Sequence, residues 1–192
     1  MDEENGRDMK VIFLDIDGVL NCAGYRQDKM KEGHISVVIQ PEHLSRLKKI
    51  VESTDASIVL ISSWRKFWQR EGNVDSAGKE IEQTFARTGL FVADKTPVLQ
   101  NGSRCHEVEL WLRNKPYVEQ FVILDDNDFS WNKKLRKHWV KCPGDTGLTD
   151  QLVETSIKVL NGMLIHSTTH RTKGFRFLSK LFCKRIAGKC SK

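Results

Sequence analysis

Short runs of apolar residues are the clearest pattern along this chain of 192 residues. Three segments stand out: VIFL at residues 11–14, SIVLI at residues 57–61 and FVIL at residues 121–124. A continuous apolar run of this length is typical of a strand that is covered on both faces of a sheet. Weaker runs at residues 90–93 and 139–142 predict two further strands.

Segments with helical spacing alternate with these runs. Pro41 suits the first position of a helix, and the leucine and isoleucine positions after it predict a helix at residues 41–53. Helices are also predicted at residues 66–70, 77–87, 103–114 and 149–164. The alternation predicts an α/β fold: a Rossmann-like, doubly wound, mostly parallel sheet with helices on both faces. Residues 22–40 are too few for a domain and predict a flap or hairpin beside the first strand.

Reactive side chains follow each of the three strong strands. The first strand ends in DIDG at residues 15–18, the second in SSWR at residues 62–65 and the third in DDND at residues 125–128. Ligands of doubly wound sheets bind beyond the carboxyl ends of the strands, so these side chains are expected to lie together. Two acids one residue apart are costly to place at a strand end, which favours a chemical role for them.

These segments resemble the motifs of the haloacid dehalogenase (HAD) superfamily of phosphatases, over about residues 10–164. The combination of DIDGVLN, SSWR and LDD is similar to a subgroup that includes HAD domains associated with RNA-repair proteins. The resemblance implies that Asp15 is the nucleophile and forms an aspartyl-phosphate. It implies that Asp17 is the general acid and then the general base.

The resemblance also implies a Mg²⁺ cofactor. Its ligands would be Asp15, the backbone carbonyl of Asp17, and Asp126, because Mg²⁺ binds a few hard oxygen ligands. Asp125 is either a further ligand or a support for its neighbour. Without a cation these carboxylates would repel one another and an anionic substrate, so metal dependence is predicted.

Phosphate-binding groups are expected beside the acids. Ser62 would hydrogen-bond a phosphoryl oxygen, with Ser63 as the alternative, and Arg65 is either a bidentate phosphate ligand or a solvated arginine. The third HAD motif is normally a lysine, and here the chain departs from that pattern. Arg104 is the preferred cation and Lys95 is the alternative.

The spacing of the motifs leaves room for only a minimal cap. About forty residues separate the first motif from the second, and much of that stretch is the predicted helix at residues 41–53. An open site favours a macromolecular phosphate, such as a polynucleotide end or a phosphoprotein. Two alternatives stay open: a non-enzymatic binding module on the same fold, and phosphotransfer to an acceptor other than water.

Charge divides the chain into an acidic extension at residues 1–9, the HAD-like domain at residues 10–165 and a basic tail at residues 166–192. The tail has eight Lys or Arg and no Asp or Glu, so the net charge of +6 becomes −2 without it. Apolar and basic tail residues fall on opposite sides of a helical wheel. This amphipathic pattern predicts contact with nucleic acid or an anionic membrane, or else a docked or solvated helix.

Cellular location is predicted from what the sequence lacks. It has no run of eighteen apolar residues and no signal-peptide pattern at its start. Its five cysteines are scattered and form no CxxC pair. A reducing cytoplasm is the predicted compartment.

Overall fold

A computed structural model describes residues 9–163, apart from residues 34–35, 71, 73–74 and 101. The basic tail at residues 166–192 and most of the N-terminal extension lie outside the described residues. Among the described residues, no helix has the length and apolar character needed to span a bilayer.

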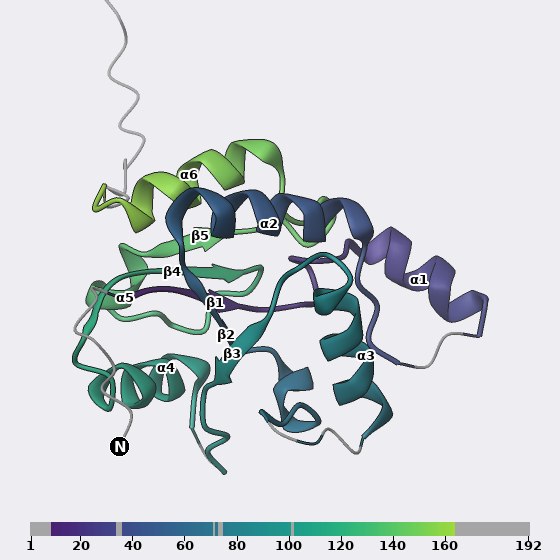
Figure 1. The fold of residues 1–192 in the computed structure, drawn as a ribbon, viewed down its shortest axis with the longest axis horizontal. Helices are drawn as coiled ribbons and strands as arrows, with labels where there is room; N and C mark the ends of the chain where they lie inside the picture. Colours follow the sequence, from purple (N-terminus) through teal and green to yellow (C-terminus); the bar gives the residue numbers. More distant parts are fainter. Residues whose placement is uncertain (1–8, 34–35, 71, 73–74, 101, 164–192) are drawn as a thin grey trace, which may run out of the picture.

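A five-stranded parallel sheet forms the centre of the fold (Figure 1). Its order is β3-β2-β1-β4-β5, and every neighbouring pair is parallel. The predicted α/β fold is therefore confirmed, with a sheet that is parallel throughout. The strands are β1 (Met9–Leu14), β2 (Ser57–Leu60), β3 (Val92–Lys95), β4 (Val118–Asp125) and β5 (Trp139–Lys141).

Strand β1 lies in the middle because its apolar run can be buried on both faces. Ile12 and Leu14 pack into one core cluster, whereas Val11 and Phe13 pack into the other. All four side chains are fully buried. The residues that follow β1 therefore emerge at the centre of the sheet's carboxyl edge.

Two layers of helices cover the sheet. The cluster that contains Ile12 includes apolar residues of α2 (Pro41–Thr54), α3 (Ser76–Ala86) and α6 (Asp150–Leu160). The cluster that contains Phe13 includes residues of α4 (Arg104–Arg113) and the short α5 (Lys133–Arg136). Figure 1 shows α2 and α6 on the side of the sheet opposite α4.

The segment after β1 differs from its prediction. Instead of a flap or hairpin it contains helix α1 (Ala23–Lys31), which has no buried residue. Ion pairs three residues apart, Lys29 with Glu32 and Lys31 with Asp28, lie on its surface. A helix with no apolar face has no apolar periodicity, so the hydrophobic pattern did not reveal it.

Other boundaries shift by a few residues. The helix predicted at residues 66–70 is a 3₁₀ turn, η1 (Ser63–Lys66), and the strand predicted at residues 90–93 is β3, two residues later. Helix α5 was not predicted, because one turn is too short to show helical periodicity.

Candidate active site

The turn after β1 brings the first acid into the site. The backbone N–H of Asp15 donates to the carbonyl of Leu124 at 2.9 Å, which ties the end of β1 to the end of β4. Gly18 has a φ of +76°, a conformation that favours glycine. Its N–H donates to Oδ1 of Asn21 at 3.0 Å and closes the turn. Asp15 is therefore held, almost fully buried, at the middle of the carboxyl edge.

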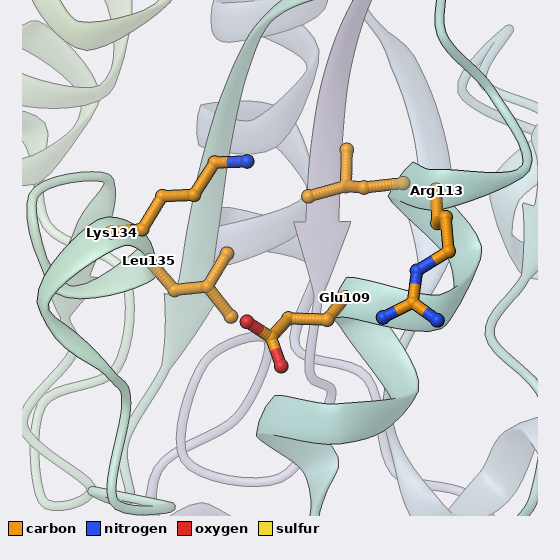
Figure 2. A pocket seen from close by; sticks show the side chains of 5 residues that line it. Glu109, Arg113, Lys134 and Leu135 are labelled. Atoms are coloured by element: carbon orange, nitrogen blue, oxygen red, sulfur yellow. The ribbon is translucent and has the colours of Figure 1, made fainter.

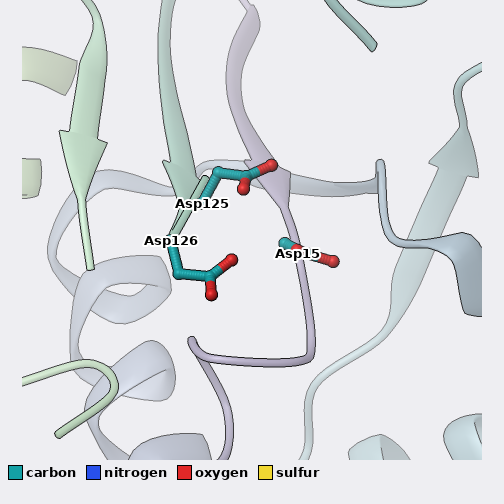
Figure 3. A group of neighbouring side chains, drawn as sticks. All are labelled: Asp15, Asp125 and Asp126. Carbon is teal, nitrogen blue, oxygen red and sulfur yellow. The ribbon is translucent and has the colours of Figure 1, made fainter. Parts of the chain in front are cut away.

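Three carboxylates gather at this edge (Figure 3). Asp15, Asp125 and Asp126 each offer an oxygen, and these oxygens lie within 4.8 Å of one another. Burial and the neighbouring charge of Asp15 raise the pKa of Asp125 to about 7. The same two causes raise the pKa of Asp126. The cluster is therefore a place where negative charge is crowded and poorly solvated.

The Asp126 carboxylate occupies a space that glycines leave open. A Cβ atom on Gly18 would lie 2.5 Å from Cγ of Asp126, and one on Gly144 would lie 3.1 Å from its Oδ2. A set of hard, crowded carboxylate oxygens suits Mg²⁺ and would be relieved of its repulsion by it. The residues present thus fit the implied metal.

Arg104 lies against this cluster. Its Nη1 is 2.9 Å from Oδ2 of Asp15 and 2.5 Å from Oδ2 of Asp125. Ser103 caps α4 by accepting from the N–H of His106, and the ring of Phe129 lies 4.2 Å from the Arg104 guanidinium. The preferred third-motif residue is therefore beside the predicted nucleophile.

The alternative cation, Lys95, binds backbone carbonyls in the structure. Its amino group donates to the backbone carbonyls of Arg65, at 3.0 Å, and Trp68. These contacts hold the end of β3 to the turn after β2. Lys95 therefore stabilises a loop, and Arg104 takes the position beside the acids.

Asp17 lies outside the group of three carboxylates, with both oxygens bound. Oδ1 accepts a hydrogen bond from Nδ2 of Asn21 at 3.0 Å and lies 3.2 Å from Nη1 of Arg26 on α1. Oδ2 accepts from the indole N–H of Trp64 at 3.0 Å. Sequence reasoning did not assign Arg26 or Trp64 to Asp17. The one available signal was the position of Trp64 within SSWR.

The two serines after β2 differ in exposure. Ser62 is buried, and its hydroxyl accepts from the N–H of Trp64 at 3.4 Å. Ser63 begins η1 and is exposed. The backbone N–H of Ile61 donates to the carbonyl of Leu14, so Ser62 follows a strand end directly beside that of β1. Its contact with phosphate stays a prediction.

Arg65 turns into the protein, contrary to the expected phosphate or solvent contact. Its guanidinium lies 2.6 Å from Oε2 of Glu107, and both side chains are about 5% exposed. It also donates to four backbone carbonyls, those of Ile61, Ser62, Thr96 and Pro97. The other Glu107 oxygen accepts from the N–H of Leu99. Arg65 therefore joins the turn after β2 to the loop before α4.

Comparison with known proteins places this site in a family. Residues 11–153 match the family described as "HAD domain in Swiss Army Knife RNA repair proteins". That stretch contains the acids at the ends of β1 and β4, the SSWR turn and Arg104. A search of curated proteins finds no match. Because the match covers most of the chain, this protein belongs to the HAD domains of Swiss Army Knife RNA repair proteins.

Proposed function

We propose that this protein is a Mg²⁺-dependent phosphomonoesterase that removes a terminal phosphate from RNA through an aspartyl-phosphate. Family membership supports a HAD-type phosphoesterase at the coarser level. One observation carries the finer proposal: the buried Asp15 at the end of β1 lies beside Arg104 and within reach of Asp126. The family description, RNA repair, supports an RNA end as the substrate.

Asp15 is suited to nucleophilic attack because its carboxylate is fixed. Oδ1 accepts from the N–H of Ile16 at 2.9 Å, and Oδ2 accepts from Arg104 at 2.9 Å. A carboxylate oxygen of Asp15 forms a bond to phosphorus while the bond from phosphorus to the leaving oxygen breaks. Arg104 offsets the negative charge that gathers there, and the Ser62 hydroxyl donates a hydrogen bond to a phosphoryl oxygen.

Asp17 moves the proton. It protonates the leaving oxygen, and it then takes a proton from the water that attacks the aspartyl-phosphate and releases inorganic phosphate. The hydrogen bonds from Asn21 and Trp64 orient its carboxylate for both steps.

Asp15, Asp126 and the backbone carbonyl of Asp17 would hold the cation. When bound, Mg²⁺ neutralises the charge that substrate phosphate adds to this acidic edge. Asp125 accepts from Arg104 and from the N–H of Asn127 at 2.9 Å, so we assign it to supporting Arg104.

The cellular setting and the tail belong to the same proposal. We keep a reducing cytoplasm as the proposed setting, because the five cysteines of the sequence are scattered and form no CxxC pair. The basic tail at residues 166–192 would add a contact to nucleic acid by its charge. Anionic membrane is the competing partner for the tail.

Phosphate release tests the function. The substrates are an aryl phosphate and RNA oligonucleotides with a 3′- or a 5′-phosphate, each with Mg²⁺ or with EDTA. We expect metal-dependent release that Asp15→Asn lowers by at least about 1,000-fold. Asp28→Asn, at an exposed acid on α1, is the matched control and should retain full activity.

Covalent trapping identifies the nucleophile separately. Acid quenching during turnover of ³²P-labelled RNA should leave label on the protein that hydroxylamine removes, as expected for an acyl phosphate. Wild-type turnover by Asp15→Asn would overturn the mechanism. Turnover without any trapped label would point to direct attack by water.

A further inference from the structure

A pocket lies between α4 and α5, apart from the three acids (Figure 2). Its volume is about 230 Å³. Figure 2 shows the amino group of Lys134, the guanidinium of Arg113 and the carboxylate of Glu109 directed into it. Leu112 and Leu135 form the rest of its wall.

We propose that this pocket binds an internal phosphate and the adjoining ribose of an RNA strand whose terminal phosphate lies at Asp15. The inference rests on the proposed function, since it names how that substrate is held beyond its reacting end.

The charges of the pocket favour a phosphodiester. Among the residues that the structure describes, neither Arg113 nor Lys134 has an ion-pair partner within 4 Å. The adjoining residues 129–144 include five Lys or Arg and no acid. Within this stretch, Arg136 forms an ion pair with Asp128 at 2.9 Å. The lysines of the stretch take no part in that ion pair. This strip is a basic surface on a domain, residues 10–165, whose overall charge is close to zero, and basic side chains bind phosphates.

Glu109 gives the pocket a second, different function. Its Oε1 accepts from Nδ2 of Asn132, which fixes the carboxylate in place. A carboxylate between two cations would weaken a site built for phosphate alone. It is suited to accept a hydrogen bond from a ribose 2′-hydroxyl, the group by which proteins distinguish RNA from DNA.

The pocket and the acidic cluster are joined by one helix. Helix α4 begins with Arg104, beside Asp15, and ends with Arg113 in the pocket wall. Nine residues at about 1.5 Å per residue separate them by roughly 13 Å along the helix. Stacked nucleotides are about 3.4 Å apart along a strand, so the pocket would hold a phosphate about four nucleotides from the end, or fewer in an extended strand.

Binding measurements test the phosphate contact. The full-length Asp15→Asn variant, which blocks turnover, is titrated by fluorescence anisotropy with terminally phosphorylated RNA of one to six nucleotides. We expect affinity to rise steeply up to about four nucleotides and then to level off. Lys134→Glu and Arg113→Glu should each weaken hexanucleotide binding by about tenfold or more. Each should lower the slope of log Kd against log salt by about 0.7 per lost phosphate contact.

Lys158→Glu is the matched control, because Lys158 is an exposed lysine on α6, in the opposite layer. It makes the same charge change and should leave both affinity and salt slope near those of the parent. Equal weakening by Lys134→Glu and Lys158→Glu would overturn the proposal, since that result would reflect overall charge alone.

A comparison of sugars tests the role of Glu109. The parent should bind the RNA hexamer more tightly than the DNA of the same sequence. Glu109→Gln, which keeps an oxygen for Asn132, should lower this preference by about threefold to tenfold. Equal binding of RNA and DNA by the parent would overturn the ribose contact.

Wild-type phosphate release with normal binding by the pocket variants would refute the pocket and leave the proposed function standing. Pocket-dependent binding without phosphate release would do the reverse.

Discussion

The indole N–H of Trp64 donates a hydrogen bond of 3.0 Å to Oδ2 of Asp17, 47 residues earlier in the chain. Asp17 is the proposed general acid and base, and its side chain is one third exposed. Arg26, on the other oxygen, is itself 42% exposed. Trp64 lies in η1, which the buried Ser62 caps, and its ring packs against the core cluster that contains Ile12, so it is the less exposed of the two partners. The turn after β2 thereby orients the acid as well as supplying the predicted hydroxyl.

Trp64→Phe should lower kcat by about tenfold or more while changing KM little. A hydrogen bond to a charged group contributes about 1.5–3 kcal/mol, and part of this would appear in the barrier. The loss should be larger for RNA ends, whose leaving group needs protonation, than for nitrophenyl phosphate. Steady-state kinetics with both substrates provides the measurement.

Trp111→Phe is the control for this variant. Trp111 donates a comparable hydrogen bond, 2.8 Å to Oδ2 of Asp94, but packs against Phe13 in the core. It should lower the melting temperature and leave kcat unchanged at temperatures where the variant is folded. Equal losses with good and poor leaving groups for Trp64→Phe would show that Trp64 does not act through proton transfer.

Gly18→Ala should remove Mg²⁺ binding and phosphate release together. The added Cβ would lie 2.5 Å from the Asp126 carboxylate, and the φ of +76° disfavours any L side chain. Calorimetric Mg²⁺ titration reports the metal site independently of turnover.

Gly24→Ala makes the same change on helix α1, where no atom lies within 4 Å of the new Cβ. It should stabilise that helix by up to about 1 kcal/mol, and Mg²⁺ affinity should stay normal. Normal Mg²⁺ binding by Gly18→Ala would refute the role assigned to Asp126.

Arg65→Met should destabilise the domain by about 3–5 kcal/mol, because it leaves the buried Glu107 charge without its partner. Burial lowers the pKa of Arg65 even against the attraction of Glu107, which shows that desolvation is substantial here. Urea unfolding gives the free energy. The double variant Arg65→Met with Glu107→Leu should recover part of the loss, since no unpaired charge remains. A change below 1 kcal/mol for the single variant would contradict this account.

The metal-free protein should lose stability as the pH rises from about 4 to 7. The pKa of Asp125 is about 7 in the folded protein and 3.8 ordinarily. The folded protein therefore retains a proton that the unfolded chain releases near pH 4. The free energy of unfolding falls between these two pKa values, and the loss is complete above about pH 7. In EDTA, the melting temperature should be higher at pH 5 than at pH 8, and Mg²⁺ should restore it at pH 8. Asp125→Asn should reduce this pH dependence, and an unchanged dependence would exclude Asp125 as its source.

Local pattern was sufficient for the sheet and for the acids at its edge. Apolar runs such as residues 11–14 and 121–124 predict buried strands, because this signal depends only on residues that are neighbours in the sequence. Parallel strands align their carboxyl ends, so Asp15 and Asp126 were expected to meet, and the structure brings them together.

Partners across the fold could not be obtained in this way. Whether Arg65 faces solvent or Glu107, and whether Lys95 or Arg104 lies beside Asp15, depends on side-chain direction and helix placement. Those choices are set by packing between elements more than thirty residues apart, which no local periodicity encodes. The sequence by itself therefore determined the sheet and its acidic edge. Only the tertiary structure determined which cation joins that edge, which tryptophan orients Asp17, and which arginine is buried as a support.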